Sequence, residues 1–194
     1  LGNMAAVLKD QGKGAEALAM QHKALDIQRR TLGSEHDHVA SSLLNLGAAY
    51  VDQGMQEEAL ARYEEGLGLV RRLHPERTVL EGRFLESIGS VYSQQGRHED
   101  AFAWWRKAHR MYRKTVGPDS AEAGGVICCT AVALSRQGKV EEAIEKNEEA
   151  LGIQRRAVGD EHPEVAQTLY NIAACKVESG DVEGAVLCLR EAQS

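Results

Sequence analysis

The sequence predicts an all-α fold, a right-handed α-solenoid of about five helix-turn-helix repeats. Small and apolar residues recur at a fixed step of 42 residues. Helix-favouring Ala, Leu, Glu, Gln and Arg dominate the composition, and glycine-containing turns separate the apolar runs. Since one repeat cannot bury its apolar face alone, we expect the repeats to stack into a single array. Their approximate bounds are 1–39, 40–81, 82–123, 124–165 and 166–194.

Four columns of residues carry the repeat. They place an apolar and a small residue on one face of a first helix, a glycine in the turn that ends it, and an alanine at the start of the second helix. The columns are Leu1, Leu43, Leu85, Ile127 and Leu169; Ala5, Gly47, Gly89, Ala131 and Ala173; Gly12, Gly54, Gly96, Gly138 and Gly180; and Ala17, Ala59, Ala101, Ala143 and Ala185.

The second repeat illustrates the elements in order. Leu43, Leu46 and Tyr50 form the apolar face of its first helix, and Gly47 allows a neighbouring helix to come close. After the turn at Gly54, a second helix is expected from about residue 56 to residue 72. Its buried stripe would be Ala59, Leu60, Tyr63, Leu67 and Val70, repeated in the third unit as Ala101, Phe102, Trp105, Ala108 and Met111.

The loops between repeats carry helix breakers and caps, and Pro163 suits the first turn of the helix that follows it. A cluster of His and acidic residues in the first of these loops has the composition of a metal site, but ordinary loop residues are the favoured interpretation. The loops are Gly33-Ser34-Glu35-His36-Asp37, Gly117-Pro118-Asp119-Ser120 and Gly159-Asp160-Glu161-His162-Pro163.

The order of the columns is that of tetratricopeptide (TPR) units, although the period alone would also fit HEAT or armadillo repeats of about 40–47 residues. Two loop-and-helix motifs resemble the lengthened units of the TPR domain of kinesin light chains. They are Leu32-Gly33-Ser34-Glu35-His36-Asp37-His38-Val39-Ala40 followed by Leu43-Leu44-Asn45-Leu46, and Val158-Gly159-Asp160-Glu161-His162-Pro163-Glu164-Val165-Ala166 followed by Leu169-Tyr170-Asn171-Ile172.

This resemblance implies that the first helices line a concave groove that receives a partner. The apolar columns define the buried side of each first helix, so residues on the opposite side are expected to face the groove. The candidate groove residues are Asn3 and Lys9 in the first repeat; Ser41, Leu44, Asn45 and Asp52 in the second; Arg83, Glu86, Ser87 and Gln94 in the third; Arg136 in the fourth; and Gln167, Tyr170, Asn171 and Glu178 in the fifth.

One groove column is rich in asparagine. An amide side chain offers two donors and an acceptor, which suits holding the backbone of an extended peptide. The alternative is that these residues cap or bridge neighbouring helices. The column is Asn3, Asn45, Ser87, Cys129 and Asn171.

Basic pairs end the second helices, and acidic residues open them. Both complement the helix macrodipole, which is a sufficient structural explanation; a basic ridge that contacts an acidic partner is the alternative. The pairs are Arg29-Arg30, Arg71-Arg72, Arg113-Lys114 and Arg155-Arg156.

Several classes of function are disfavoured. The formal net charge of −6 argues against a nucleic-acid partner. The sequence has no apolar run of about 18 residues, so we expect no membrane insertion. It also has no catalytic or phosphate-binding motif, so we expect neither an enzyme nor a cofactor. The cysteines, Cys128, Cys129, Cys175 and Cys188, show no CxxC spacing, which argues against zinc or a disulfide framework and favours the reducing cytoplasm.

The leading hypothesis is therefore a protein–protein interaction scaffold that binds a peptide or helical segment in its groove. The alternative is a self-associating or spacer segment of a larger signalling or transport-adaptor protein. The first repeat opens within a helix, and Lys176 stands where other repeats carry Tyr50, Tyr92 and Leu134. Because terminal repeats need polar caps, we expect the array to belong to a longer chain, with apolar ends that stack on other molecules when exposed.

Overall fold

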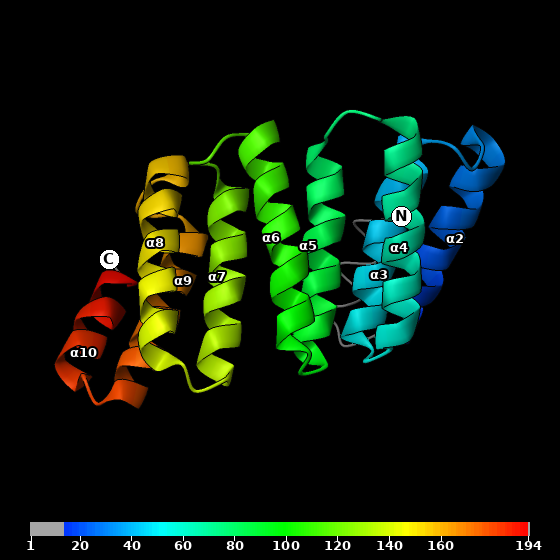
Figure 1. Cartoon of the computed structure of the whole chain (residues 1–194). Coiled ribbons are helices and arrows are strands. Elements are labelled where there is room, and N and C mark those ends of the chain that lie inside the picture. The colour runs from blue at the N-terminus through cyan, green and yellow to red at the C-terminus, as the bar shows by residue number, and fades with distance from the viewer. Residues whose placement is uncertain (1–13, 194) are drawn as a thin grey trace. The chain divides into compact units, whose positions relative to one another are not determined.

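The computed structural model describes residues 14–193, which form helices joined by short loops (Figure 1). Among these residues there is no strand, and the predicted all-α repeat fold is confirmed. The predicted residues Asn3, Lys9 and Gly12 lie outside the described part. The helices are α2 (Gly14–Leu32), α3 (Asp37–Asp52), α4 (Gln56–Leu73), α5 (Val79–Gln94), α6 (His98–Thr115), α7 (Ala121–Arg136), α8 (Val140–Val158), α9 (Pro163–Ser179) and α10 (Val182–Glu191).

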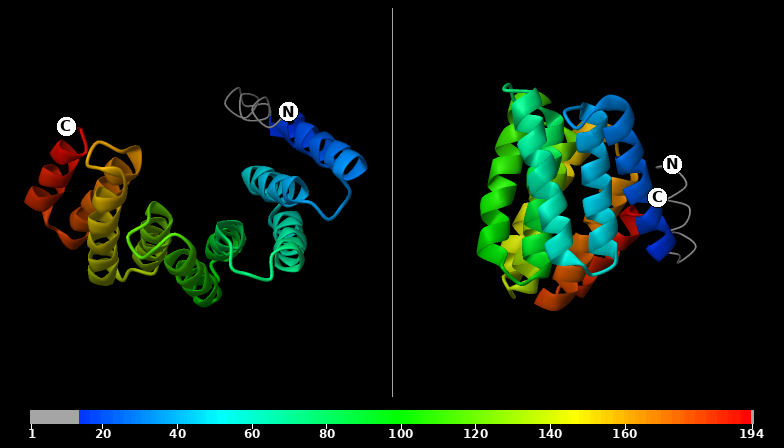
Figure 2. Two further views of the ribbon diagram at one scale, coloured as in Figure 1. Left: turned by 90° about the horizontal axis from the view of Figure 1, so that it is seen from above. Right: turned by 90° about the vertical axis from the view of Figure 1, so that its right-hand side faces the viewer.

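The chain divides into two compact units, Leu1–Trp104 and Trp105–Ser194. In the first unit α2 packs on α3, α3 on α4 and α4 on α5. In the second unit α7 packs on α8, α8 on α9 and α9 on α10. Two further contacts, α3 with α5 and α7 with α9, join first helices of successive repeats. Consecutive helices from α2 to α5 and from α7 to α10 therefore lie side by side (Figure 2).

A glycine lies in the turn between the two helices of the second to fifth repeats, as predicted. Gly54, Gly96, Gly138 and Gly180 have φ angles of 73°, 75°, 75° and 87°. This left-handed conformation is readily adopted only by a residue without a Cβ atom. The turn geometry therefore explains why this column contains glycine alone.

The core of the first unit follows the predicted stripe, since Ala59, Leu60, Tyr63, Leu67 and Val70 on α4 are all buried. Gly47 on α3 lies directly under the Tyr63 ring, where a Cβ atom would collide with the aromatic carbons. The close helix approach predicted for the small-residue column thus occurs here.

The two tryptophans of α6 differ in burial. Trp105 is 3% exposed, as its place in the core column predicts. Trp104 is half-buried and stacks on Tyr92 of α5, with ring centroids 6.5 Å apart and an interplanar angle of 15°. Trp104 therefore packs between helices.

The first helices are capped by one column of inter-repeat residues. The side chains of His36, Thr78, Ser120 and His162 each accept a hydrogen bond from a backbone N–H in the first turn of the helix that follows. Pro163 occupies the first turn of α9, as expected. The caps satisfy backbone donors that have no partner within the helix.

The acidic and histidine residues of the first inter-repeat loop serve the fold. His36 caps α3, Glu35 pairs with Arg72 of α4 at 3.0 Å, and Asp37 pairs with His74 at 2.6 Å. Within residues 14–193, no group of three His, Cys, Asp or Glu residues is arranged to hold a metal ion. None of the helices described is both long and apolar enough to cross a membrane.

Candidate functional site

In the first unit, α3 presents a stripe of exposed small and polar residues. Ser41, Asn45, Ala48 and Asp52 are exposed and follow one another at helical spacing, so they share one side of α3. The other sides of α3 are covered, because it packs on α2, α4 and α5. This stripe is the part of α3 that a partner could reach.

Leu44 differs from its predicted place on this surface. Its side chain is only 6% exposed. The apolar column predicts burial on one side of α3, but three neighbouring helices cover the helix more widely than one column implies. Ser42, which no groove prediction included, is also buried, and its hydroxyl donates to Gln28 Oε1 at 2.5 Å.

On α5, Arg83 and Gln94 are exposed, whereas Glu86 and Ser87 are half-buried. Ser87 forms a hydrogen bond with the buried Tyr63 of the preceding repeat. Burial raises the pKa of Tyr63 to about 12, although the hydrogen bond from Ser87 acts in the opposite direction. Ser87 thus joins two repeats, the alternative role considered for its column.

In the second unit, α9 presents a stripe like that of α3. Gln167, Tyr170, Ala174 and Glu178 are exposed at helical spacing, and Tyr170 is 41% exposed. An exposed tyrosine offers a large apolar body with a polar tip, a combination that partners often contact. Arg136 is exposed at the end of α7.

Asn171 is half-buried beside this stripe. Its amide donates to Cys128 Sγ on α7 at 3.6 Å and accepts from Gln167 Nε2 at 3.3 Å. Cys128 also contacts Asn147 Oδ1 at 3.4 Å and Thr168 Oγ1 at 3.3 Å. Asn171 of α9 therefore forms a bridge to α7, the first helix of the preceding repeat. Asn45, in the same column, is exposed instead.

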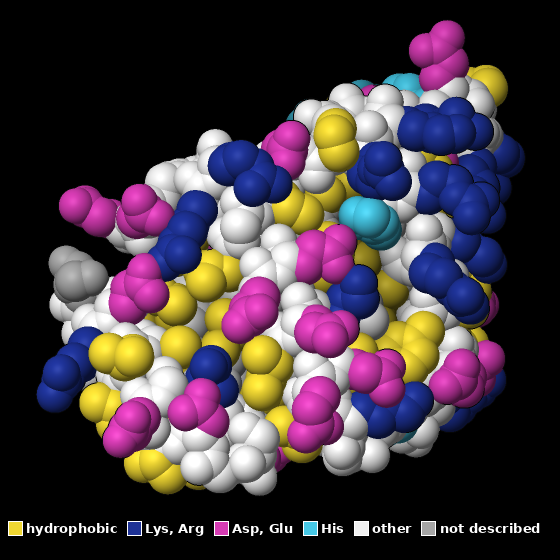
Figure 3. All heavy atoms as spheres, turned by 60° about the vertical axis from the view of Figure 1, so that its left-hand side comes forward, with side chains coloured by type: hydrophobic (Ala, Val, Ile, Leu, Met, Phe, Trp, Pro, Cys, Tyr) yellow, Lys and Arg dark blue, Asp and Glu magenta, His cyan; other side chains and the backbone are white. Residues whose placement is uncertain are grey.

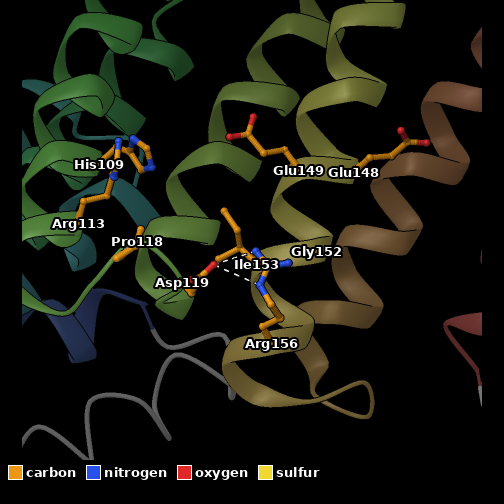
Figure 4. Close-up of a pocket in the computed structure, with 9 residues that line it drawn as sticks. All are labelled: His109, Arg113, Pro118, Asp119, Glu148, Glu149, Gly152, Ile153 and Arg156. Carbon is orange, nitrogen blue, oxygen red and sulfur yellow. Dashed lines mark hydrogen bonds and ion pairs between the residues drawn. The ribbon is translucent and has the colours of Figure 1, made fainter.

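A feature that the groove prediction missed lies on the second helices of the second unit. An open depression of ≈ 570 Å³ runs between α6 and α8 (Figure 4). His109 and Arg113 of α6 lie on one side, and Glu148 and Glu149 of α8 on the other. Burial and the neighbouring Arg113 lower the pKa of His109, against the influence of Glu149. The sequence signal for this feature is the replacement of a core leucine by His109.

Each unit consists of helices packed in sequence order, and one first helix in each unit, α3 or α9, presents an exposed stripe. This arrangement defines an α-helical repeat protein. Two family models, both described as tetratricopeptide repeat, match the chain over residues 1–72 and 128–194 and over residues 84–122. The chain therefore belongs to the tetratricopeptide repeat family, a non-enzymatic scaffold fold that generally mediates protein–protein interaction.

Solved structures share this fold at low sequence identity. BtubC (BKLC) from P. vanneervenii is 21% identical and aligns over 97% of this chain and 75% of its own, with a TM-score of 0.78. The putative kinesin light chain TPR-like repeats of Podosopora anserina are 21% identical over 99% and 91%, with a TM-score of 0.73. MamA is 16% identical over 97% and 92%, with a TM-score of 0.58. Comparison with curated proteins finds no match. The predicted resemblance to kinesin light chain repeats is confirmed at the level of the fold.

Proposed function

We propose that this chain is a scaffold that binds a peptide or a helical segment of a partner protein in a groove lined by its first helices. The observation that carries the proposal is the exposed stripe of Ser41, Asn45, Ala48 and Asp52 on α3. The residues of this stripe do not contribute to the core, because α3 makes its packing contacts with α2, α4 and α5 through its other sides. Its side chains are either small or rich in hydrogen-bonding groups.

The chemistry of the stripe suits an extended or helical segment. Ala48 leaves room for a backbone to approach, and the Asn45 amide can donate to a carbonyl and accept from an N–H of the same partner. On α9, Tyr170 adds an aromatic surface. These features support recognition of backbone and shape more than recognition of one charge.

To test this proposal, a peptide that binds the whole chain is first selected from a displayed random library. Its affinity is then measured for variants of the stripe. Asn45→Arg places a long side chain in the middle of the stripe. We expect it to weaken binding of the selected peptide by about tenfold or more, a change of ~1.4 kcal/mol. Tyr170→Ala examines the stripe on α9 in the same way. Fluorescence anisotropy of the labelled peptide measures the affinity.

Ala61→Arg is the matched control, because Ala61 is also exposed and helical but lies on α4, a second helix. It should leave the affinity unchanged. An equal loss in Asn45→Arg and Ala61→Arg, or no loss in either stripe variant, would show that the peptide binds elsewhere.

A second candidate function is self-association, or a spacer role within a larger signalling or transport-adaptor protein. It is favoured by apolar side chains at the outer side of α10, where Val182 is 61%, Val186 41% and Leu187 65% exposed. Removal of such a surface from water is worth ~25 cal/mol per Å², which favours contact with another apolar helix. We also propose a cytoplasmic location, since all four cysteines are free thiols.

A further inference from the structure

Helix α6 departs from the repeat at positions where the second and fourth repeats agree. Each departure adds a cation or a histidine, and two of them replace a glutamate. The departures, each followed by its equivalents one repeat before and after, are Arg106 for Glu64 and Glu148, Lys107 for Glu65 and Glu149, His109 for Leu67 and Leu151, and Arg110 for Gly68 and Gly152.

The helix macrodipole explains only part of this charge. It favours cations in the last turn of a helix, where Arg113 and Lys114 stand. Arg106 and Arg110 lie further back along α6, and the effect of the dipole falls off within about one turn. Their presence needs another explanation.

Among the described residues, Arg113 and Lys114 also lack the ion-pair partners that their equivalents in the second and fourth repeats have. Arg72 pairs with Glu35 at 3.0 Å, and Arg156 pairs with Asp119 at 2.8 Å. Arg71 and Arg155 form ion pairs as well. By contrast, no ion pair to another described residue is formed by Arg106, Arg110, Arg113 or Lys114, all of which are exposed.

The geometry brings these side chains together. Arg106, Arg110 and Lys114 follow one another at i, i+4 and i+8, and with His109, Arg113 and Pro118 they line an open depression of ≈ 470 Å³. Like charges at this spacing repel one another and destabilise a helix. Bound carboxylates would offset that repulsion by attracting each of the cations. Figure 3 shows Lys and Arg side chains gathered beside a histidine, with acidic side chains spread over the neighbouring surface.

We propose that the basic face of α6, formed by Arg106, His109, Arg110, Arg113 and Lys114, is a second docking surface that takes a short acidic segment of a protein partner. Guanidinium groups bind carboxylates through paired, charge-assisted hydrogen bonds. The surface lies on a second helix and shares no residue with the candidate groove, so it stands independently of the function proposed above.

The surroundings favour a short acidic segment over a long polyanion. Glu148 and Glu149 line the opposite side of the adjoining depression, and the chain as a whole has a net charge of −6. A nucleic acid or an anionic membrane would extend over these carboxylates and be repelled. A short acidic segment needs only the α6 side.

A dye-labelled short peptide of glutamate residues, titrated into the whole chain at low ionic strength, tests the proposal. Binding should shift the backbone amide NMR signals of α6 and weaken as salt is added. In Arg106→Glu/Arg110→Glu, we expect the affinity to fall by about tenfold, because two attractions become repulsions. Glutamate occurs at the position of Arg106 in two other repeats, so the fold should tolerate it.

Lys23→Glu/Lys139→Glu is the control with the same change in net charge, made at exposed residues of α2 and of the start of α8. It should bind the peptide nearly as well as the wild type. Absence of peptide binding, or an equal loss in both double variants, would overturn the proposal. So would preferential binding of a single-stranded oligonucleotide or of phosphatidylserine vesicles, tested in parallel.

Discussion

His109 occupies a position that the second and fourth repeats fill with a buried leucine, Leu67 or Leu151. Its imidazole is partly buried beside Arg113, and both conditions disfavour its charged form. The effect of His109 on the free energy of unfolding depends on pH, because its imidazole binds a proton more readily in the unfolded chain than in the folded chain. One side chain thereby makes the fold sensitive to acid.

Replacement of the histidine by leucine, His109→Leu, should remove this sensitivity to acid. The folded pKa of His109 lies below its unfolded value near 6.5, so its contribution to stability is lost as pH falls through about 6.5. The variant should gain free energy of unfolding relative to the wild type between about pH 7 and about pH 5. Urea denaturation at several pH values measures this gain. A difference between the two proteins that is the same at every pH would contradict it.

At the scale of elements, the first helices α3, α5, α7 and α9 each begin at a capping side chain, as does the second helix α10 at Asp181, while the second helices α4 and α8 do not. Ser120 Oγ accepts from the Ala123 N–H at 3.2 Å at the start of α7, whereas α4 and α8 have no side-chain cap. Acidic residues in the first turns of α4 and α8 complement the macrodipole instead. Helices α4 and α8 thus begin by a different physical means from the first helices.

Ser120→Ala should therefore destabilise the second unit by roughly 1 kcal/mol, since it leaves a backbone donor of α7 without its acceptor. Ser120→Asp is the matched control, because aspartate also accepts at this position and should preserve stability. Urea denaturation followed by circular dichroism measures the change. If both variants matched the wild type, the cap would contribute nothing.

The elements were predictable from the sequence to a greater degree than the surfaces were. A glycine such as Gly54 and a core residue such as Tyr63 act through local conformation and burial, which leave a periodic signal. Exposure on a first helix depends on how widely its neighbours cover it, which is why Leu44 is buried against expectation. The hydrogen bond between Asn171 and Cys128 likewise depends on the distance between α9 and α7. The sequence pattern does not predict that distance.

At the scale of the whole molecule, the exposed apolar side of α10 has the strongest bearing on assembly. In solenoids the apolar face of a repeat is covered either by a neighbouring repeat or by polar residues. Val182 and Leu187 are more than half exposed, so this surface favours contact with another apolar helix. A second copy of the chain is the simplest source of such a helix in a purified sample.

Light scattering over a concentration series tests whether the chain associates with itself through α10. If α10 mediates self-association, the mass of the wild type should rise with concentration, and Val182→Lys/Leu187→Lys should remain monomeric because lysine cannot be buried unpaired. Ile27→Lys, at a residue of α2 that is 40% exposed, should behave like the wild type. A wild type that is monomeric at every concentration would exclude self-association as the function.

The chain has two tryptophans, and both stand next to each other on α6. Intrinsic fluorescence excited at the indole band therefore reports on one turn of one helix, with the Tyr92 ring stacked against Trp104. Circular dichroism averages over every helix instead. Because repeat arrays need not unfold in a single step, a mismatch between the two optical transitions would locate the loss of α6 within the unfolding of the array without any added label.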